Sequence, residues 1–210
     1  MIVQWGIKGL MLPDDDAALQ IIDRRQGLVS NWMRNEKDGL IRVSDIPGKL
    51  TPENLDLHVN HFDEPDPVTG RPVAEVTPFI SIACGVVSRV EASKTNDVIS
   101  AFGIAQKFAT DSATLPFGYL YWCWVLVSPR PAVEIESVAE EVRDLNSYRS
   151  YSKFQPEGEV VAKVVVPSNQ IHRCEKWTWS RRDKMYKREW KHLNPAFVEP
   201  ERLSNVREVI

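Results

Sequence analysis

The sequence feature that most constrains the fold is a nearly unbroken apolar run, FGYLYWCWVLV, at residues 117–127. Apolar side chains occupy both alternating sets of positions, which is typical of a strand buried on both faces. The run is also far shorter than the roughly 20 apolar residues that a membrane-spanning helix requires. It therefore predicts a central strand of a sheet that carries other elements on each face.

The segments around this strand predict helices and strands in no regular order. Helices are expected within residues 14–34, 50–62, 96–112 and 133–145, and strands within residues 39–48, 75–88 and 159–167. Because no strand–helix–strand rhythm repeats, the pattern indicates an α+β domain rather than a doubly wound parallel sheet. The sequence also contains no GxGxxG motif and no phosphate-binding loop motif.

The overall composition is that of an ordinary globular domain. The 210 residues are 43% hydrophobic and 26% charged, and a net charge of -3 gives no general attraction to nucleic acid or to anionic membranes. Cys84, Cys123 and Cys174 show no CxxC spacing, which predicts reduced thiols. The first residues do not have the pattern of a signal peptide. We therefore expect a cytoplasmic protein, or one delivered into a target cell, with no membrane partner.

Two glutamates stand one residue apart where the strand expected at residues 159–167 begins. Glu157 and Glu159 flank a glycine in the segment QPEGEVV. Side chains at positions i and i+2 of a strand point to the same side, so both carboxylates would face one region of the protein. From the residues alone, a solvated loop end and a carboxylate pair that serves a cleft both remain open.

Three motifs stand in an order that resembles a known enzyme family. Arg42 lies in LIRVSD, Ser81 lies in TPFISIA, and Glu159 follows Glu157 in PEGEVV. This order resembles the Arg-Ser-Glu group of mono-ADP-ribosyltransferases, the cholera-toxin-like class, and the ending HLNPAF is similar to the pierisin and scabin branch. The likeness covers most of the chain between residues 40 and 197.

The sequence departs from the family pattern at several positions. The Ser-Thr-Ser motif of the family is here Ser81-Ile82-Ala83, so only the first hydroxyl remains. Arg24 and Arg25 compete with Arg42 for the role of the family arginine. A second Glu-x-Glu at residues 134–136 lacks a following strand and is therefore the weaker candidate.

The resemblance implies a fold, a division of the chain and an activity. The fold would be an ADP-ribosyltransferase-like split β-sandwich of mostly antiparallel sheets with flanking helices. Residues 1–38 would form an N-terminal helical segment packed on a catalytic domain at residues 39–210. The activity would be that of a toxin or effector that cleaves the nicotinamide–ribose bond of NAD and transfers ADP-ribose to a protein or nucleic-acid acceptor.

The resemblance also assigns catalytic roles. Glu159 would stabilise the positive charge that develops on the ribose of NAD. Glu157 would orient or deprotonate the accepting nucleophile. Ser81 would hydrogen-bond and orient Glu159, and Arg42 would grip the pyrophosphate through paired hydrogen bonds.

Further expectations concern the nicotinamide ring, other ligands and partners. Tyr148, Tyr151 or Phe154 would offer an aromatic face to nicotinamide. His58 and His61 lie three residues apart, but a structural pair is expected rather than a metal site because no acidic or cysteine partners stand at ligand spacing. An antitoxin or immunity protein is a further expected partner.

Three alternatives remain open at this stage. One is a degenerate family member that has kept the fold and serves only as an interaction domain. Water as the acceptor would make the protein an NAD glycohydrolase. The segment at residues 172–192 also interleaves basic residues with Trp177, Trp179, Tyr186 and Trp190, which is the composition of a non-catalytic nucleic-acid-binding module. A closing hairpin whose tryptophans pack on the sheet is the preferred interpretation of this segment.

Overall fold

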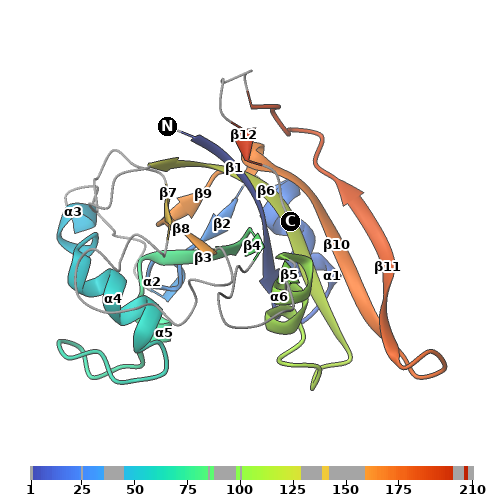
Figure 1. Ribbon diagram of the computed structural model, residues 1–210, viewed down its shortest axis with the longest axis horizontal. Coiled ribbons are helices and arrows are strands. Elements are labelled where there is room, and N and C mark those ends of the chain that lie inside the picture. The colour runs from blue at the N-terminus through green and yellow to red at the C-terminus, as the bar shows by residue number, and fades with distance from the viewer. Residues whose placement is uncertain are drawn as a thin grey trace.

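The protein is described by a computed structural model in which a mostly antiparallel sheet is flanked by short helices (Figure 1). The described residues are 2–24, 26–35, 45–84, 86–87, 98–99, 101–128, 139–141, 159–200 and 206–207. The helices are α1 (Asp15–Asp23), α2 (Asn31–Asn35), α3 (Ile46–Lys49), α4 (Pro52–Asn60), α5 (Val73–Val76), α6 (Ala101–Ala109) and the 3-10 helix η4 (Ser168–Gln170). The strands are β1 (Ile2–Leu10), β2 (Leu28–Val29), β3 (Phe79–Ala83), β4 (Val86–Val87), β5 (Val98–Ile99), β6 (Phe117–Ser128), β7 (Ala139–Glu141), β8 (Glu159–Lys163), β9 (Val165–Val166), β10 (Ile171–Ser180), β11 (Met185–Leu193) and β12 (Val206–Arg207).

The main sheet has the strand order β11-β10-β6-β7-β8-β3-β1-β12, with an additional pairing between β6 and β1. β1 pairs with β6 along its whole length but with β3 through one residue pair, Ile7 and Ala83. The sheet is therefore split into one half built on β1, β6, β10 and β11 and another built on β3, β7 and β8. In Figure 1 the ribbon of β3 runs across the direction of β1 and β6. The fold class is the expected α+β arrangement of mostly antiparallel strands.

The central strand predicted at residues 117–127 is confirmed as β6. It lies between β10 and β1 and also pairs with β7. Tyr119, Tyr121, Cys123 and Val125 are fully buried in one core, and Tyr121 donates a hydrogen bond to Ala18 O of α1 at 2.9 Å. On the opposite face, buried Leu120 packs with alanines of α6. The two faces of β6 thus carry two separate cores.

α6 lies very close to the backbone of β1 and β6. A Cβ atom placed on Gly9 would stand 1.9 Å from Ala105 O, and one on Gly118 would stand 2.3 Å from Ala109 O. Both contacts are with helix backbone, which cannot move aside without moving the helix. Glycine at these two positions therefore sets the distance between helix and sheet.

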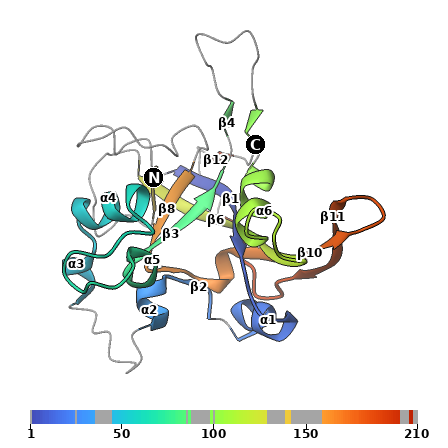
Figure 2. The same ribbon diagram turned by 90° about the horizontal axis from the view of Figure 1, so that it is seen from below.

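A helical layer covers the other half of the sheet. α3, α4 and α5 lie together beside β3 and β8 in both views (Figures 1 and 2). Leu55 and Val59 of α4 are buried against Phe79 of β3 and Val161 of β8. Thr51 caps α4, the helix expected within residues 50–62, because its Oγ1 accepts a hydrogen bond from Asn54 N at 3.2 Å.

Other sequence expectations need correction. Residues 2–10 were expected to belong to a helical segment but form β1, so the helical description fits only residues 15–23 and 31–35. Residues 139–141 were expected within an acidic helix but form β7, which pairs with β6 and β8. Pro47 and Gly48 were expected to end a strand but belong to α3.

Asn194 fixes the ending HLNPAF through two hydrogen bonds. Buried Asn194 donates from Nδ2 to Ser168 O at 2.6 Å and to Ile171 O at 2.8 Å, so it ties the chain after β11 to η4.

Among the described residues, no helix is both long enough and apolar enough to cross a bilayer.

The close approach of α6 gives a stability prediction. Gly9→Ala should lower the free energy of unfolding by about 2–3 kcal/mol, because the added methyl group overlaps Ala105 O and forces the helix away. Gly103→Ala, in the same helix, meets no atom within 4 Å and should raise the free energy of unfolding by about 0.5–1 kcal/mol. Urea unfolding monitored by circular dichroism measures both changes, and equal effects of the two substitutions would contradict the packing described.

Candidate functional site

Ser81 and Glu159 lie on one face of the β3–β8 pair. In this antiparallel register Ala83 is opposite Glu159, and Ser81 is opposite Val161. Paired residues share a face, and so do residues two positions apart on a strand, which places Ser81 diagonally across from Glu159. Glu159 is half-buried at the start of β8. The structure therefore brings together the serine and the second glutamate of the motif order.

The other predicted site residues cannot be placed. Glu157, Arg42, Tyr148 and Phe154 lie outside the described residues, as do Arg25, Tyr151 and the Glu-x-Glu at 134–136. Arg24 is described and is exposed at the C-cap of α1. The preceding residue, Asp23, accepts a hydrogen bond from His192 Nε2 of β11 at 2.9 Å, so this end of α1 lies against β11 rather than β8.

His58 of α4 contacts Ser81 directly. Its Nε2 is 2.8 Å from Ser81 Oγ, and its Nδ1 is 2.8 Å from Thr77 Oγ1. The ring is buried, with the Phe62 and Phe79 rings at centroid distances of 5.6 Å and 5.7 Å. Burial, reinforced by the nearby charge of Lys8, lowers the pKa of His58 to about 3. The imidazole is therefore neutral at physiological pH, with one nitrogen donating and the other accepting.

The hydrogen bonds around His58 favour the tautomer that carries the ring proton on Nε2. Thr77 Oγ1 already accepts the amide proton of Phe79 at 3.3 Å, which favours donation of its own proton to His58 Nδ1. Nε2 then carries the ring proton and donates it to Ser81 Oγ. This arrangement leaves the Ser81 hydroxyl proton free to be donated to an acceptor on the same face of the sheet.

Lys8 adds a cation to the site. Ala83 pairs with both Ile7 of β1 and Glu159 of β8, so these three residues form one row across the sheet. Lys8 is the next residue after Ile7 along β1. Burial lowers the pKa of Lys8, the negative charge of Glu159 opposes this shift, and the positive charge of Arg34 reinforces it. Lys8 and Glu159 therefore interact electrostatically where the two halves of the sheet separate.

Sequence reasoning missed Lys8 and the role of His58. The segment IVQWGIKGL contains one charged residue in an otherwise apolar and glycine-containing stretch, and that isolated lysine was the available signal. His58 was expected to be a structural histidine, and its burial agrees with that expectation. Its contact with Ser81 joins residues 23 positions apart, a pairing that no local pattern reveals.

The chemistry of this cluster suits a ligand that carries both positive and negative charge. A carboxylate stabilises positive charge, an ammonium group attracts phosphate, and the Thr77–His58–Ser81 chain holds a hydroxyl in a fixed orientation. Across the part of the chain that the structure describes, no group of three His, Cys, Asp or Glu side chains could hold a metal ion.

No family model matches the chain, and no curated protein matches its sequence significantly. Among solved structures, the chain is similar to EcPltA, with a TM-score of 0.55, 13% identity, and coverage of 99% of this chain and 94% of that chain.

Two structures of heat-labile enterotoxin variants are also similar, although less closely. A variant with a flexible active-site loop in the A subunit shares 15% identity over 98% of this chain and 81% of its own, with a TM-score of 0.47. An inactive E. coli variant with a substituted buried residue shares 18% identity over 91% of this chain and 76% of its own, with a TM-score of 0.47. The likeness to the pierisin and scabin branch stays a prediction. The chain has the α+β fold of ADP-ribosyltransferase toxins.

Proposed function

We propose that this protein is a mono-ADP-ribosyltransferase that uses NAD as its substrate, with Glu159 as its central catalytic residue. The observation that carries the proposal is the position of Glu159, which lies on the same face as Ser81 and interacts with Lys8 at the split of the sheet. The fold supports the proposal because it is that of ADP-ribosyltransferase toxins.

The reaction breaks the bond between ribose C1′ and the nicotinamide nitrogen. The bonding electron pair leaves with nicotinamide, which becomes neutral, and positive charge develops on the ribose. The Glu159 carboxylate stabilises this charge, and Ser81 holds the carboxylate by donating the hydroxyl proton that His58 leaves free. A nucleophile of the acceptor then bonds to C1′ and loses its proton to Glu157. Water in place of a macromolecular acceptor gives NAD hydrolysis at the same site.

Lys8 contributes to binding of the pyrophosphate, together with Arg42. Its ammonium is partly withdrawn from water, so a phosphate oxygen would restore hydrogen bonds that burial removes. Attraction to the nearby Glu159 limits the lowering of the Lys8 pKa. The two opposite charges would therefore suit the two parts of the ligand, with the cation toward phosphate and the carboxylate toward ribose.

The catalytic assignment is tested by nicotinamide release. Glu159→Gln keeps the size of the side chain but removes its charge, and should lower the rate of nicotinamide release from NAD by about 100-fold or more. Glu64→Gln, which changes an exposed glutamate paired with His61, is the matched control and should leave the rate unchanged. Undiminished release by a folded Glu159→Gln protein would refute the assignment. A higher rate after addition of cell lysate would indicate a macromolecular acceptor.

The role of Lys8 is tested by a pair of substitutions. Lys8→Met keeps the chain length but removes the charge, and should raise the KM for NAD by about tenfold, the effect of losing one phosphate contact. Lys8→Arg should retain much of the affinity because guanidinium also binds phosphate. Steady-state kinetics across NAD concentrations separate KM from kcat, and equal KM values for all three proteins would exclude phosphate binding by Lys8.

The neutral state of His58 predicts a pH dependence of stability. The pKa of His58 is lowered from 6.5 to about 3 in the folded protein, so between these values the unfolded chain binds one more proton than the folded one. Stability from this group is present above pH 6.5 and is lost as pH falls, by about 1.4 kcal/mol per pH unit at most. Urea unfolding of the wild-type protein and of His58→Gln measures this slope. The slope of the free energy of unfolding against pH should be smaller in His58→Gln than in the wild-type protein by about one proton equivalent. Identical slopes in the two proteins would contradict a neutral buried His58.

A further inference from the structure

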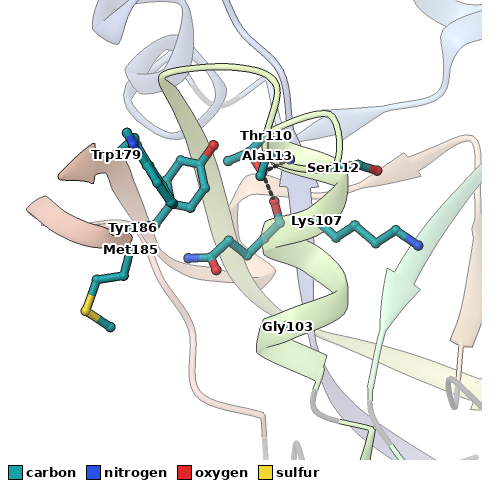
Figure 3. Close-up of a pocket in the computed structure, with 9 residues that line it drawn as sticks. Gly103, Lys107, Thr110, Ser112, Ala113, Trp179, Met185 and Tyr186 are labelled. Carbon is teal, nitrogen blue, oxygen red and sulfur yellow. Dashed lines mark hydrogen bonds between the residues drawn. The ribbon is translucent and has the colours of Figure 1, made fainter. Parts of the chain in front are cut away.

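An open groove lies between α6, the turn that follows it, and the tip of the β10–β11 hairpin (Figure 3). Its volume is about 460 Å³, a size that admits a large side chain with its neighbours. α6 supplies Gly103, Gln106 and Lys107, and the hairpin supplies Trp179, Met185 and Tyr186. None of these residues belongs to the site around Glu159.

The hairpin side of the groove is apolar and accessible. Met185 is 54% exposed and Trp179 is 40% exposed, which are high fractions for large apolar side chains. The Trp179 and Tyr186 rings meet edge to face with centroids 5.2 Å apart. The Tyr186 hydroxyl donates to Leu115 O, so this ring is fixed to the turn across the groove. The apolar surface is therefore preformed and open to a ligand.

The wall opposite the hairpin has an unusual backbone. Asp111, Ser112 and Ala113 follow one another with φ angles of 46°, 53° and 71°, a left-handed conformation that non-glycine residues rarely adopt. Hydrogen bonds from Ser112 N to Lys107 O at 2.8 Å and from Leu115 N to Thr110 O at 3.0 Å hold this turn. Strained backbone of this kind is found disproportionately at ligand clamps.

The rim of the groove is positively charged. Arg181, Arg182 and Lys184 are exposed in the hairpin turn, and Lys107 projects from α6. Within the described ranges none of these four side chains has an ion-pair partner, whereas the neighbouring Lys187 is paired with Asp183 at 2.7 Å. The charges that remain are complementary to an anionic partner.

The aromatic residues of the hairpin do not form a platform for a nucleic-acid strand. Trp177 packs on Phe102 at 4.7 Å and donates from Nε1 to buried Glu175. Trp190 donates from Nε1 to Asp15 and packs against a buried tyrosine. Only Trp179 offers an open ring, whereas single-stranded nucleic acid is bound by successive bases stacked on several rings. Trp177 and Trp190 therefore pack as expected for this segment, whereas Trp179 does not.

We propose that the groove docks an acidic protein segment that inserts one large apolar side chain between Trp179 of the hairpin and α6. The carboxylates of that segment pair with Arg181, Arg182 and Lys184. This binding function goes beyond ADP-ribosyl transfer and does not rest on it, because the groove shares no residue with the proposed catalytic site.

The test uses short synthetic peptides and the full chain. One fluorescent Glu-rich peptide carries a central Trp, a second carries Ser at that position, and a third probe is an oligo(dT) strand. Fluorescence anisotropy measures the affinity of each probe for the wild-type protein. The Trp peptide should bind about tenfold more tightly than the Ser peptide, because only it fills the groove.

Three substitutions locate the binding. Gly103→Leu places a side chain in open space within the groove and should weaken binding of the Trp peptide about tenfold or more. Arg182→Glu should weaken it similarly, whereas Lys191→Glu, the same charge change at the other end of β11, should have little effect. Circular dichroism and urea unfolding verify that each variant is folded.

Specific outcomes would overturn the proposal. Equal binding of the Trp and Ser peptides would show that the apolar surface plays no part. Unchanged binding by Gly103→Leu, or absence of binding at millimolar peptide, would place the partner elsewhere. Tighter binding of oligo(dT) than of the Trp peptide, lost on Trp179→Ala, would assign the groove to nucleic acid instead.

Discussion

The residue pair between Ile7 and Ala83 joins the two halves of the sheet beside the proposed catalytic site, and the halves meet a second time where β7 pairs with β6. β1 stays paired with β6 over nine residues, whereas its pairing with β3 is limited to this position. Because Ala83 is also opposite Glu159, this pair places the backbone of β1 next to the row of β3 and β8 that contains Glu159. α6 clamps the same region by packing on Gly9. Strand pairing and the packing of α6 thus set the backbone positions from which the polar side chains of the site extend.

The polar residues of the site are held in states that they would not adopt in water. His58 is kept neutral by burial, and its two hydrogen bonds fix the hydroxyl of Ser81. Lys8 is partly desolvated but remains within the field of Glu159. Groups oriented in this way need little rearrangement when charge develops on a bound substrate, which is the main source of electrostatic catalysis.

The sequence predicted the elements whose signals are local. The unbroken apolar run predicts β6, and the apolar residues after Glu159 predict β8. Thr51 and Pro52 are the local signals for the start of α4. β1 was missed because Gly6 and Gly9 weaken its strand propensity, and both glycines are required by neighbours that pack from other parts of the chain. β7 has three residues and exists because β6 and β8 pair with it. Within the candidate site, Ser81 and Glu159 were predicted as neighbours from their motifs, but Lys8 and the His58 contact depend on tertiary pairing.

The central claim is that NAD binds at the split of the sheet with its reactive ribose beside Glu159. A crystal structure of the Glu159→Gln protein with NAD tests it most directly, because the substitution should slow cleavage without removing the binding surface. The account predicts ribose C1′ next to residue 159 and the pyrophosphate next to Lys8. NAD bound at any other place, or no bound NAD at a concentration that saturates the protein in solution, would contradict the account.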